Sequence, residues 1–293
     1  LEQDSNLRTS HALVAVSDDA NPVGNWEMHR INVEEADTYF WDYTGLGWDA
    51  DAIYLTGNMV PWPGTGKDVH ASVLTIDKAS VLDGNNDTIT CYQVDLPGLF
   101  VVQPAVMHGA KPGDPMYFAA SWRSDRGGGW NHGNVEILRM TDKLSAAPTF
   151  TEYDIPVAKF ATPPDPTQPE PGQPFYTDET MSSVAWRDNH LVAAQTVGTD
   201  KVARARWLKV DPATTLRLTT HTTGLPFWRS SAARSFQMMA CKARRKAPSG
   251  RGVSRGVWLA RVMAWPQSRL EAYNPPRCHR QQPVGRTPAG CLG

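Results

Sequence analysis

One order of segments recurs along this chain, and it constrains the fold more than any other feature. Its clearest copy is residues 45–78, where an apolar segment (53–56) and a β-favouring segment (72–76) are separated by a polar, Pro/Gly-rich loop. The copy closes with Asp77 and Lys78. The same order recurs at residues 103–143 and 180–212, and half of it at 11–33. Short apolar segments bounded by turn residues are typical of β-strands.

A further β-favouring segment follows each full copy, so every copy predicts four antiparallel strands. These fourth segments are residues 88–94, 149–155 and 215–220. Four antiparallel strands repeated every ~45 to 70 residues are typical of propeller blades. The best helical candidate before residue 225, residues 77–82, is a single turn. We therefore expect an all-β fold over residues 1–225: a β-propeller of four-stranded antiparallel blades, incomplete at about three and a half blades.

Residues 226–293 differ in composition from the rest of the chain. They hold 13 Lys and Arg against one acid, Glu271, whereas residues 1–225 hold 16 Lys and Arg against 29 Asp and Glu, a balance of −13. The alternating pattern is also lost there. We expect a basic, non-propeller tail, either disordered or read out of frame. It is a basic arm for nucleic acid or an anionic surface, or the product of a frameshift. Loss of the repeat partway through a ring favours the frameshift, so a nucleic-acid partner is not favoured.

The cysteines divide in the same way. Cys91 is alone in residues 1–225, and Cys241, Cys278 and Cys291 lie in the tail. We expect Cys91 to be a packed core thiol, with no disulfide in the body. The apolar runs are far shorter than a membrane span requires, so no span is expected. The sequence begins at Leu1 without a leader pattern, so we expect a mature form or a fragment in which no signal peptide is visible.

Propellers place ligand sites at one mouth of the channel, where the innermost strands begin. The segments at this place are residues 41–44, 102–104 and 177–180, and they contain no Arg. The candidate ligand-binding residues in them are Asp42, Tyr43, Gln103, Asp178 and Glu179. Carboxylates with a tyrosine suit sugar chemistry, but no guanidinium is present to grip a sugar carboxylate. Trp41, Trp48 and Trp62 lie near these loops and could stack on a sugar ring or fill the core.

Metal and cofactor motifs are weak. Residues 83–88 have the D-x-N-x-D start of a calcium loop but lack its glycine and its closing glutamate. A hairpin turn explains the same residues. No histidine pair has the spacing of a zinc helix, and no catalytic residue can be named. We expect no metal and no cofactor, with calcium as the alternative at residues 83–88.

Two loops and two longer segments carry a resemblance to known proteins. Ser17, Asp19, Gly24 and Trp26, and again residues 124–130 (SDRGGGW), resemble the Asp-box hairpins of sialidase-like propellers. Residues 41–58 (WDYTGLGWDADAIYLTGN) and 183–197 resemble a group of secreted bacterial propeller proteins of unassigned activity. The resemblance implies a propeller fold and a secreted or cell-surface location, and it implies no mechanism.

The function expected from these observations is binding rather than catalysis. We expect a secreted or cell-surface propeller that binds a glycan or a protein ligand at the channel mouth. The alternative is a sialidase-like glycoside hydrolase or lyase that uses Asp42 with Asp178 or Glu179. Neither hypothesis identifies the ligand or the oligomeric state.

Overall fold

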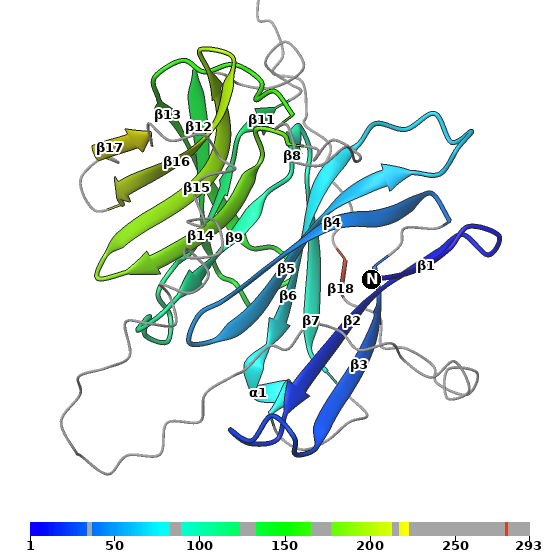
Figure 1. The fold of residues 1–293 in the computed structure, drawn as a ribbon. Helices are drawn as coiled ribbons and strands as arrows, with labels where there is room; N and C mark the ends of the chain where they lie inside the picture. The colour runs from blue at the N-terminus through cyan, green and yellow to red at the C-terminus, as the bar shows by residue number, and fades with distance from the viewer. Residues whose placement is uncertain are drawn as a thin grey trace, which may run out of the picture.

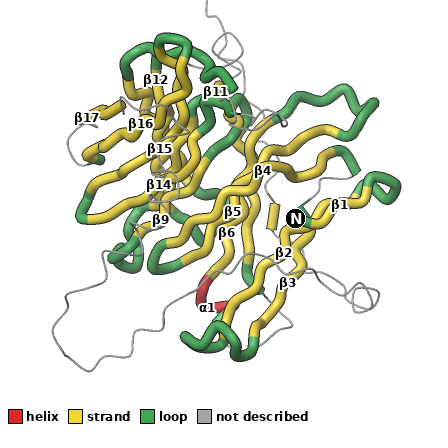
Figure 2. Tube along the Cα trace, in the orientation of Figure 1, coloured by secondary structure: helices red, strands yellow, loops and turns green. Residues whose placement is uncertain are grey.

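The computed structural model describes residues 1–33, 37–82, 89–123, 133–165, 177–212, 217–222 and 279–280. These residues are mostly β, and their largest sheet curls into a half-barrel (Figure 1). Strands joined by loops account for nearly all of the described residues, as Figure 2 shows. The exception is one helical turn, α1 (Lys78–Val81), capped by the Asp77 side chain, which accepts a hydrogen bond from the Ala79 amide. The expected one-turn helix is therefore confirmed. No helix in this described part of the chain is long and apolar enough to cross a membrane.

The large sheet contains three antiparallel four-stranded units, which we call the first, second and third modules. The first module is β4 (Tyr39–Trp48), β5 (Ala52–Pro61), β6 (His70–Asp77) and β7 (Cys91–Leu96). The second is β9 (Gln103–Met107), β10 (Met116–Ala120), β12 (Asn134–Thr141) and β13 (Thr149–Pro156). The third is β14 (Met181–Arg187), β15 (His190–Thr199), β16 (Val202–Asp211) and β17 (Arg217–Thr222). Each module coincides with one copy of the sequence repeat.

A separate three-stranded sheet precedes the modules. It consists of β1 (Glu2–Asp4), β2 (Thr9–Ser17) and β3 (Trp26–Asn32), paired antiparallel in chain order. The repeat pattern predicted β2 and β3 but not β1. Two short strands, β8 (Leu99–Phe100) and β11 (Trp122–Arg123), pair with each other.

The first strands of the three modules lie side by side and run parallel. β9 is hydrogen-bonded to β4 on one side and to β14 on the other, with Trp48 opposite Val106 and Val184 opposite Ala105 (Figure 1). A Cβ on Gly47 would lie 2.4 Å from the Ala105 carbonyl oxygen, and one on Gly45 would lie 2.7 Å from Pro104 Cδ. The glycines thus let β4 approach β9 closely. Because the three strands are parallel, they define two ends: an entry end where β9 and β14 begin and an exit end where they finish.

The core lies between the modules. One cluster joins all three, with Tyr54, Phe118 and Trp186 among its buried side chains. A second cluster packs the first module against the N-terminal sheet, with Trp41 and Ile31 at its centre. Neighbouring units therefore bury each other's apolar faces, which accounts for the nearly continuous burial along β5 and β10.

The structure describes two residues of the tail, 279 and 280, and it bears on the expectation for Cys91. β18 (His279–Arg280) pairs parallel with β7, with His279 aligned with Tyr92, and residues 223–278 and 281–293 lie outside the described residues. Cys91 is disulfide-bonded, so the expectation of a free core thiol was wrong. The other three cysteines all fall in residues 226–293. The sequence analysis excluded a disulfide only by treating the body in isolation from the tail.

Candidate functional site

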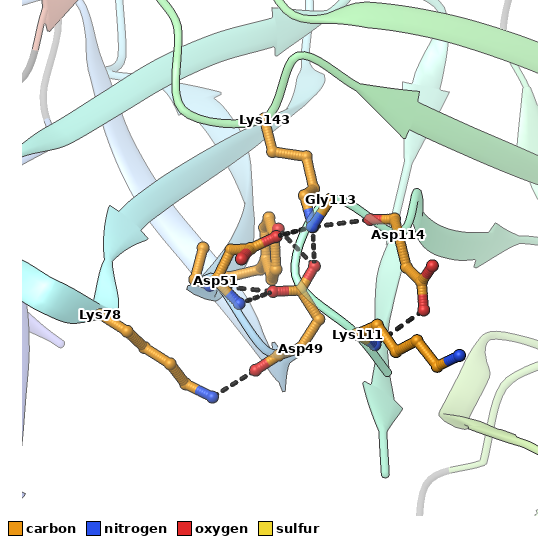
Figure 3. A network of polar contacts seen from close by, with 9 residues as sticks. Asp49, Asp51, Lys78, Lys111, Gly113, Asp114 and Lys143 are labelled. Atoms are coloured by element: carbon orange, nitrogen blue, oxygen red, sulfur yellow. Dashed lines mark hydrogen bonds and ion pairs between the residues drawn. The ribbon is translucent and has the colours of Figure 1, made fainter. Parts of the chain in front are cut away.

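The exit end carries a compact cluster of charged side chains around the turn between β4 and β5 (Figure 3). Asp49 organises this turn, because its Oδ1 accepts hydrogen bonds from the backbone amides of Asp51 and Ala52, both at 2.8 Å. The hydroxyl of Tyr54 donates to Asp49 Oδ2 at 2.9 Å. A short Asx turn of this kind follows from the Asp-Ala-Asp sequence.

Two lysines from the ends of third strands converge on this turn. Lys143 Nζ lies 2.5 Å from Asp49 Oδ2 and 2.8 Å from Asp51 Oδ2, and it donates to the Asp114 carbonyl at 2.7 Å. Lys78 Nζ donates to the Asp49 carbonyl. Lys143 belongs to the second module and Asp49 to the first, so the cluster joins two modules. The Asp-Lys pairs that close the sequence repeats supply both lysines.

The protonation equilibria of the cluster follow from these contacts. Burial alone would raise the pKa of Asp51. However, the hydrogen bonds from Lys143 and from the Gly113 amide (2.8 Å) outweigh it, and the pKa lies below its ordinary value. Burial lowers the pKa of Lys78, opposed by Asp49 and Asp51, and burial beside Asp49 raises the pKa of Tyr54 far above its ordinary value. The acids here are matched by lysines and amide donors, which is the pattern of a structural ion-pair network.

The entry end holds the residues that the sequence analysis selected. Asp42 and Tyr43 lie in β4 where its pairing with β5 shifts register between Asp42 and Gly45. Tyr43 has a φ of 54° and is 46% exposed. Bulky residues rarely adopt this left-handed conformation, and bulges of this kind often redirect a side chain beside a functional site. The bulge therefore turns the Tyr43 ring out of the sheet.

A hydrogen-bond chain links this bulge to the segment before β14. The Tyr43 hydroxyl lies 3.0 Å from Thr180 Oγ1, and Thr180 Oγ1 donates to Asp178 Oδ1 at 2.5 Å. The Thr180 amide also donates to Asp178 Oδ1, at 3.1 Å. A threonine hydroxyl has one hydrogen, so Thr180 accepts from Tyr43. The chain thus passes across the start of β9 and brings Tyr43 and Asp178 together.

Gln103, at the start of β9, completes this group. It is 8% exposed, and its Oε1 lies 2.7 Å from the position of a Cβ on Gly45, within the β4 bulge. The same position lies 2.5 Å from Thr56 Oγ1, so the Gln103 side chain packs against the sheet beside the buried Gly45 and Thr56. The structure therefore places four of the five predicted residues at the entry end: Asp42, Tyr43, Gln103 and Asp178.

Glu179, the fifth, points inward instead. It is 0% exposed, and its Oε1 accepts a hydrogen bond from Thr162 Oγ1 at 2.8 Å. Its carbonyl accepts from Ser121 and Gln195, and Gln195 in turn accepts from Arg206 at 2.9 Å. Burial lowers the pKa of Arg206 to about 10. Glu179 therefore belongs to a buried polar group behind the entry end, although it is adjacent to Asp178 in sequence.

The three tryptophans considered for stacking are not equivalent. Trp41 and Trp62 are buried, and Trp62 packs against Phe40 with ring centroids 4.6 Å apart. Trp48 contacts His108 edge-on at the exit end. Core packing therefore accounts for Trp41 and Trp62, and the exposed aromatic ring at the entry end is Tyr43.

Metal binding finds no support among the described residues, where no group of three or more His, Cys, Asp or Glu side chains is arranged to hold an ion. The candidate calcium loop at 83–88 and the second Asp-box-like loop at 124–130 lie outside those residues. In the first such loop, Asp19 Oδ1 accepts from the Asn21 amide, and the Trp26 indole donates to the Pro22 carbonyl. Its identification as an Asp box stays a prediction.

Sequence reasoning missed two groups. Thr180 was not selected, because a hydroxyl that relays between two other residues has no sequence signature. The exit cluster was also missed, although the repeated Asp-Lys pairs were visible, because the repeat does not reveal that Lys143 reaches the turn of another module. Comparison of the chain with protein-family models, with curated proteins and with solved structures found no match.

Proposed function

We propose that the three modules are blades of a β-propeller in a secreted or cell-surface protein, and that the entry end binds a glycan. The modules support the fold assignment because each is a four-stranded antiparallel unit whose first strand lies parallel to its neighbours. Propellers have this arrangement around a central channel. Their ligand sites lie where the first strands begin, which is the end that carries Tyr43.

The observation that carries the proposal is the geometry of Tyr43. The residue has a left-handed backbone conformation, and its ring is 46% exposed. Such strain costs ~1–3 kcal/mol and persists where surrounding structure imposes it, often at ligand sites. The bulge and the contact with Thr180 hold an aromatic face beside Asp42, Gln103 and Asp178. Sugars are bound by this combination of a flat apolar ring and polar groups that meet hydroxyls.

The test is binding of the 293-residue chain to an array of neutral, amino and acidic oligosaccharides, followed by calorimetry on the best ligand. Tyr43→Ala should weaken binding at least ~10-fold, because it removes the ring that faces the sugar. Leu144→Ala is the matched control, since Leu144 is 39% exposed and follows Lys143 at the exit end. Its affinity should stay within about twofold of the parent.

Three results would overturn the proposal. The first is the absence of any oligosaccharide ligand, and the second is equal loss of affinity in both variants. The third is steady release of product from a glycoside at a rate that Asp42→Asn abolishes, which would establish the hydrolase alternative. A protein ligand would be indicated if the array is silent and the chain captures one defined protein that Tyr43→Ala no longer captures.

A further inference from the structure

Strand pairing at the edge of the first module bears on the disulfide partner of Cys91. Cys91 opens β7, is 2% exposed and is disulfide-bonded. The chain has four cysteines, so the bond goes to Cys241, Cys278 or Cys291. All three lie in the basic tail. The disulfide therefore connects the first module to a segment that follows all three modules in the chain.

The register of β18 on β7 distinguishes these three cysteines. The two strands are parallel, with His279 aligned with Tyr92. In the sequence Cys91 immediately precedes Tyr92. Cys278 immediately precedes His279. Continuing the register back by one residue therefore aligns Cys278 with Cys91. Neighbouring strands lie ~4.8 Å apart, which is within the Cα–Cα separation of ~4.4–6.8 Å that a disulfide spans.

The direction of the Cys91 side chain agrees with this pairing. Cys91 belongs to the core cluster between the first module and the N-terminal sheet, together with Ile31 and Ile76. Side chains alternate between the faces along a strand, so aligned residues of parallel strands share a face. Neither Cys241 nor Cys291 adjoins β18 in the sequence. The pairing of β18 with β7 therefore does not bring either of them to Cys91.

We propose that Cys91 and Cys278 form the disulfide, which fastens the end of the tail to the first module. The bond forms when the two thiols lose two electrons and two protons to a disulfide oxidant such as oxidised glutathione, which becomes two thiols. β17 and β18 are the two ends of the strand order in the large sheet. The chain that leaves the third module at β17 is thus tied covalently to the opposite end of the sheet. This inference does not depend on the proposed glycan site.

The bond compensates for the shortness of β18. The strand is two residues long, and pairing of this length is too weak to hold two segments together by itself. A covalent link keeps β18 at a high effective concentration beside β7. Reduction of the disulfide therefore releases β18 and leaves β7 as an open sheet edge. The fastening is sensitive to redox conditions, and it suits the oxidising compartments in which disulfides persist.

The test is mass spectrometry of a non-reduced tryptic digest of the full chain, folded with a glutathione redox pair and with free thiols blocked. Trypsin separates the three tail cysteines, because they fall in residues 235–242, 278–280 and 287–293. The peptide with Cys91 should be linked to residues 278–280. Monomeric protein is used, so that a bond between two copies is not counted.

Variants test whether the bond fastens the tail. Cys278→Ser should leave Cys91 as a free thiol and lower the melting temperature by ~5–10 °C in the absence of reductant. It should also speed tryptic cleavage after Arg277, as reductant does in the parent. Cys241→Ser is the matched control, since it removes another tail cysteine, and it should behave as the parent does. The digest of the parent chain remains decisive if Cys278→Ser does not fold.

Three results would overturn the proposal. The first is a link from Cys91 to residues 235–242 or 287–293, and the second is a Cys91 thiol that is free in the folded parent. The third is a Cys278→Ser variant whose melting temperature and cleavage rate equal those of the parent without reductant, because the bond then fastens nothing. A link between Cys91 and Cys278 that is found only in disulfide-linked dimers counts with the second result.

Discussion

The two ends of the parallel strands use the same residue types to opposite effect. At the exit end, Asp49 and Asp51 are matched by Lys143, Lys78 and backbone amides. At the entry end, Asp42 and Asp178 accept hydrogen bonds from backbone amides and a hydroxyl, and no lysine or arginine in the described part of the chain forms an ion pair with either. The exit-end acids are held by cations from two modules, whereas the entry-end acids are held by local hydrogen bonds. The environment therefore separates two kinds of carboxylate that sequence alone does not distinguish.

The largest expected effect is at the exit end. Lys143→Met should lower the free energy of unfolding by ~3–5 kcal/mol, because it leaves the buried Asp49 carboxylate without its cation. Urea denaturation measures it. Lys111→Met is the control, since Lys111 is exposed in the neighbouring turn and contacts Asp114 through its backbone amide and carbonyl. Equal losses of stability in Lys143→Met and Lys111→Met would contradict the stabilising role of the Lys143 ion pairs.

The close approach of β4 and β9 gives the next largest effect. Gly47→Ala should cost ~1–3 kcal/mol, because the added methyl group meets the Ala105 carbonyl, which is backbone and cannot rotate away. Gly133→Ala places a methyl group in open space and should be nearly neutral. Thermal melting of the pair measures the difference, and equal melting temperatures would refute the strand spacing described above.

A pH series sharpens the comparison further. A carboxyl whose pKa falls on folding stabilises the folded state above its unfolded pKa, about 3.9, and loses this contribution as the pH falls through the folded value. Asp51 is such a group. Asp51→Asn should therefore cost ~1.5 kcal/mol at pH 7, and its deficit relative to the parent should be constant above about pH 5 and shrink in stronger acid. A deficit that persists unchanged at pH 2.5 would contradict the pairing with Lys143.

The smallest stability effect is expected at the entry end. Tyr43→Gly removes a residue strained at positive φ, and this gain offsets the lost hydrogen bond to Thr180. Stability should stay within ~0.5 kcal/mol of the parent while glycan affinity falls at least ~10-fold. A loss of stability comparable to that of Lys143→Met would mean that both ends are structural.

Sequence reasoning predicted the strand order well because strand alternation and turn residues are local properties. The second, third and fourth strands of each module fall where the repeat places them, and the single helical turn is where Asp77 caps it. The radial arrangement of a propeller stays a prediction. Four of the five selected residues could be brought to one end by a local argument, since inner strands that run parallel begin at the same side.

Three features that the sequence analysis did not foresee share a physical cause. Glu179 is buried because alternation along an extended segment sends neighbouring side chains to opposite sides, and its inward partners, Thr162 and Ser121, come from distant segments. Cys91 was called free because its partner lies outside the body that the repeat defines. The Lys143 contact spans 94 residues. Long-range pairings of this kind depend on how modules pack, which no local pattern encodes.

The reach of Lys143 into the preceding module has a consequence for biosynthesis. While a nascent chain on the ribosome stops short of that lysine, the completed first module (β4 to β7) holds the Asp49 carboxylate without its ion-pair partner. It gains its final stability only when the following unit emerges and delivers that partner. Synthesis of the second module is thus coupled to the final stability of the first.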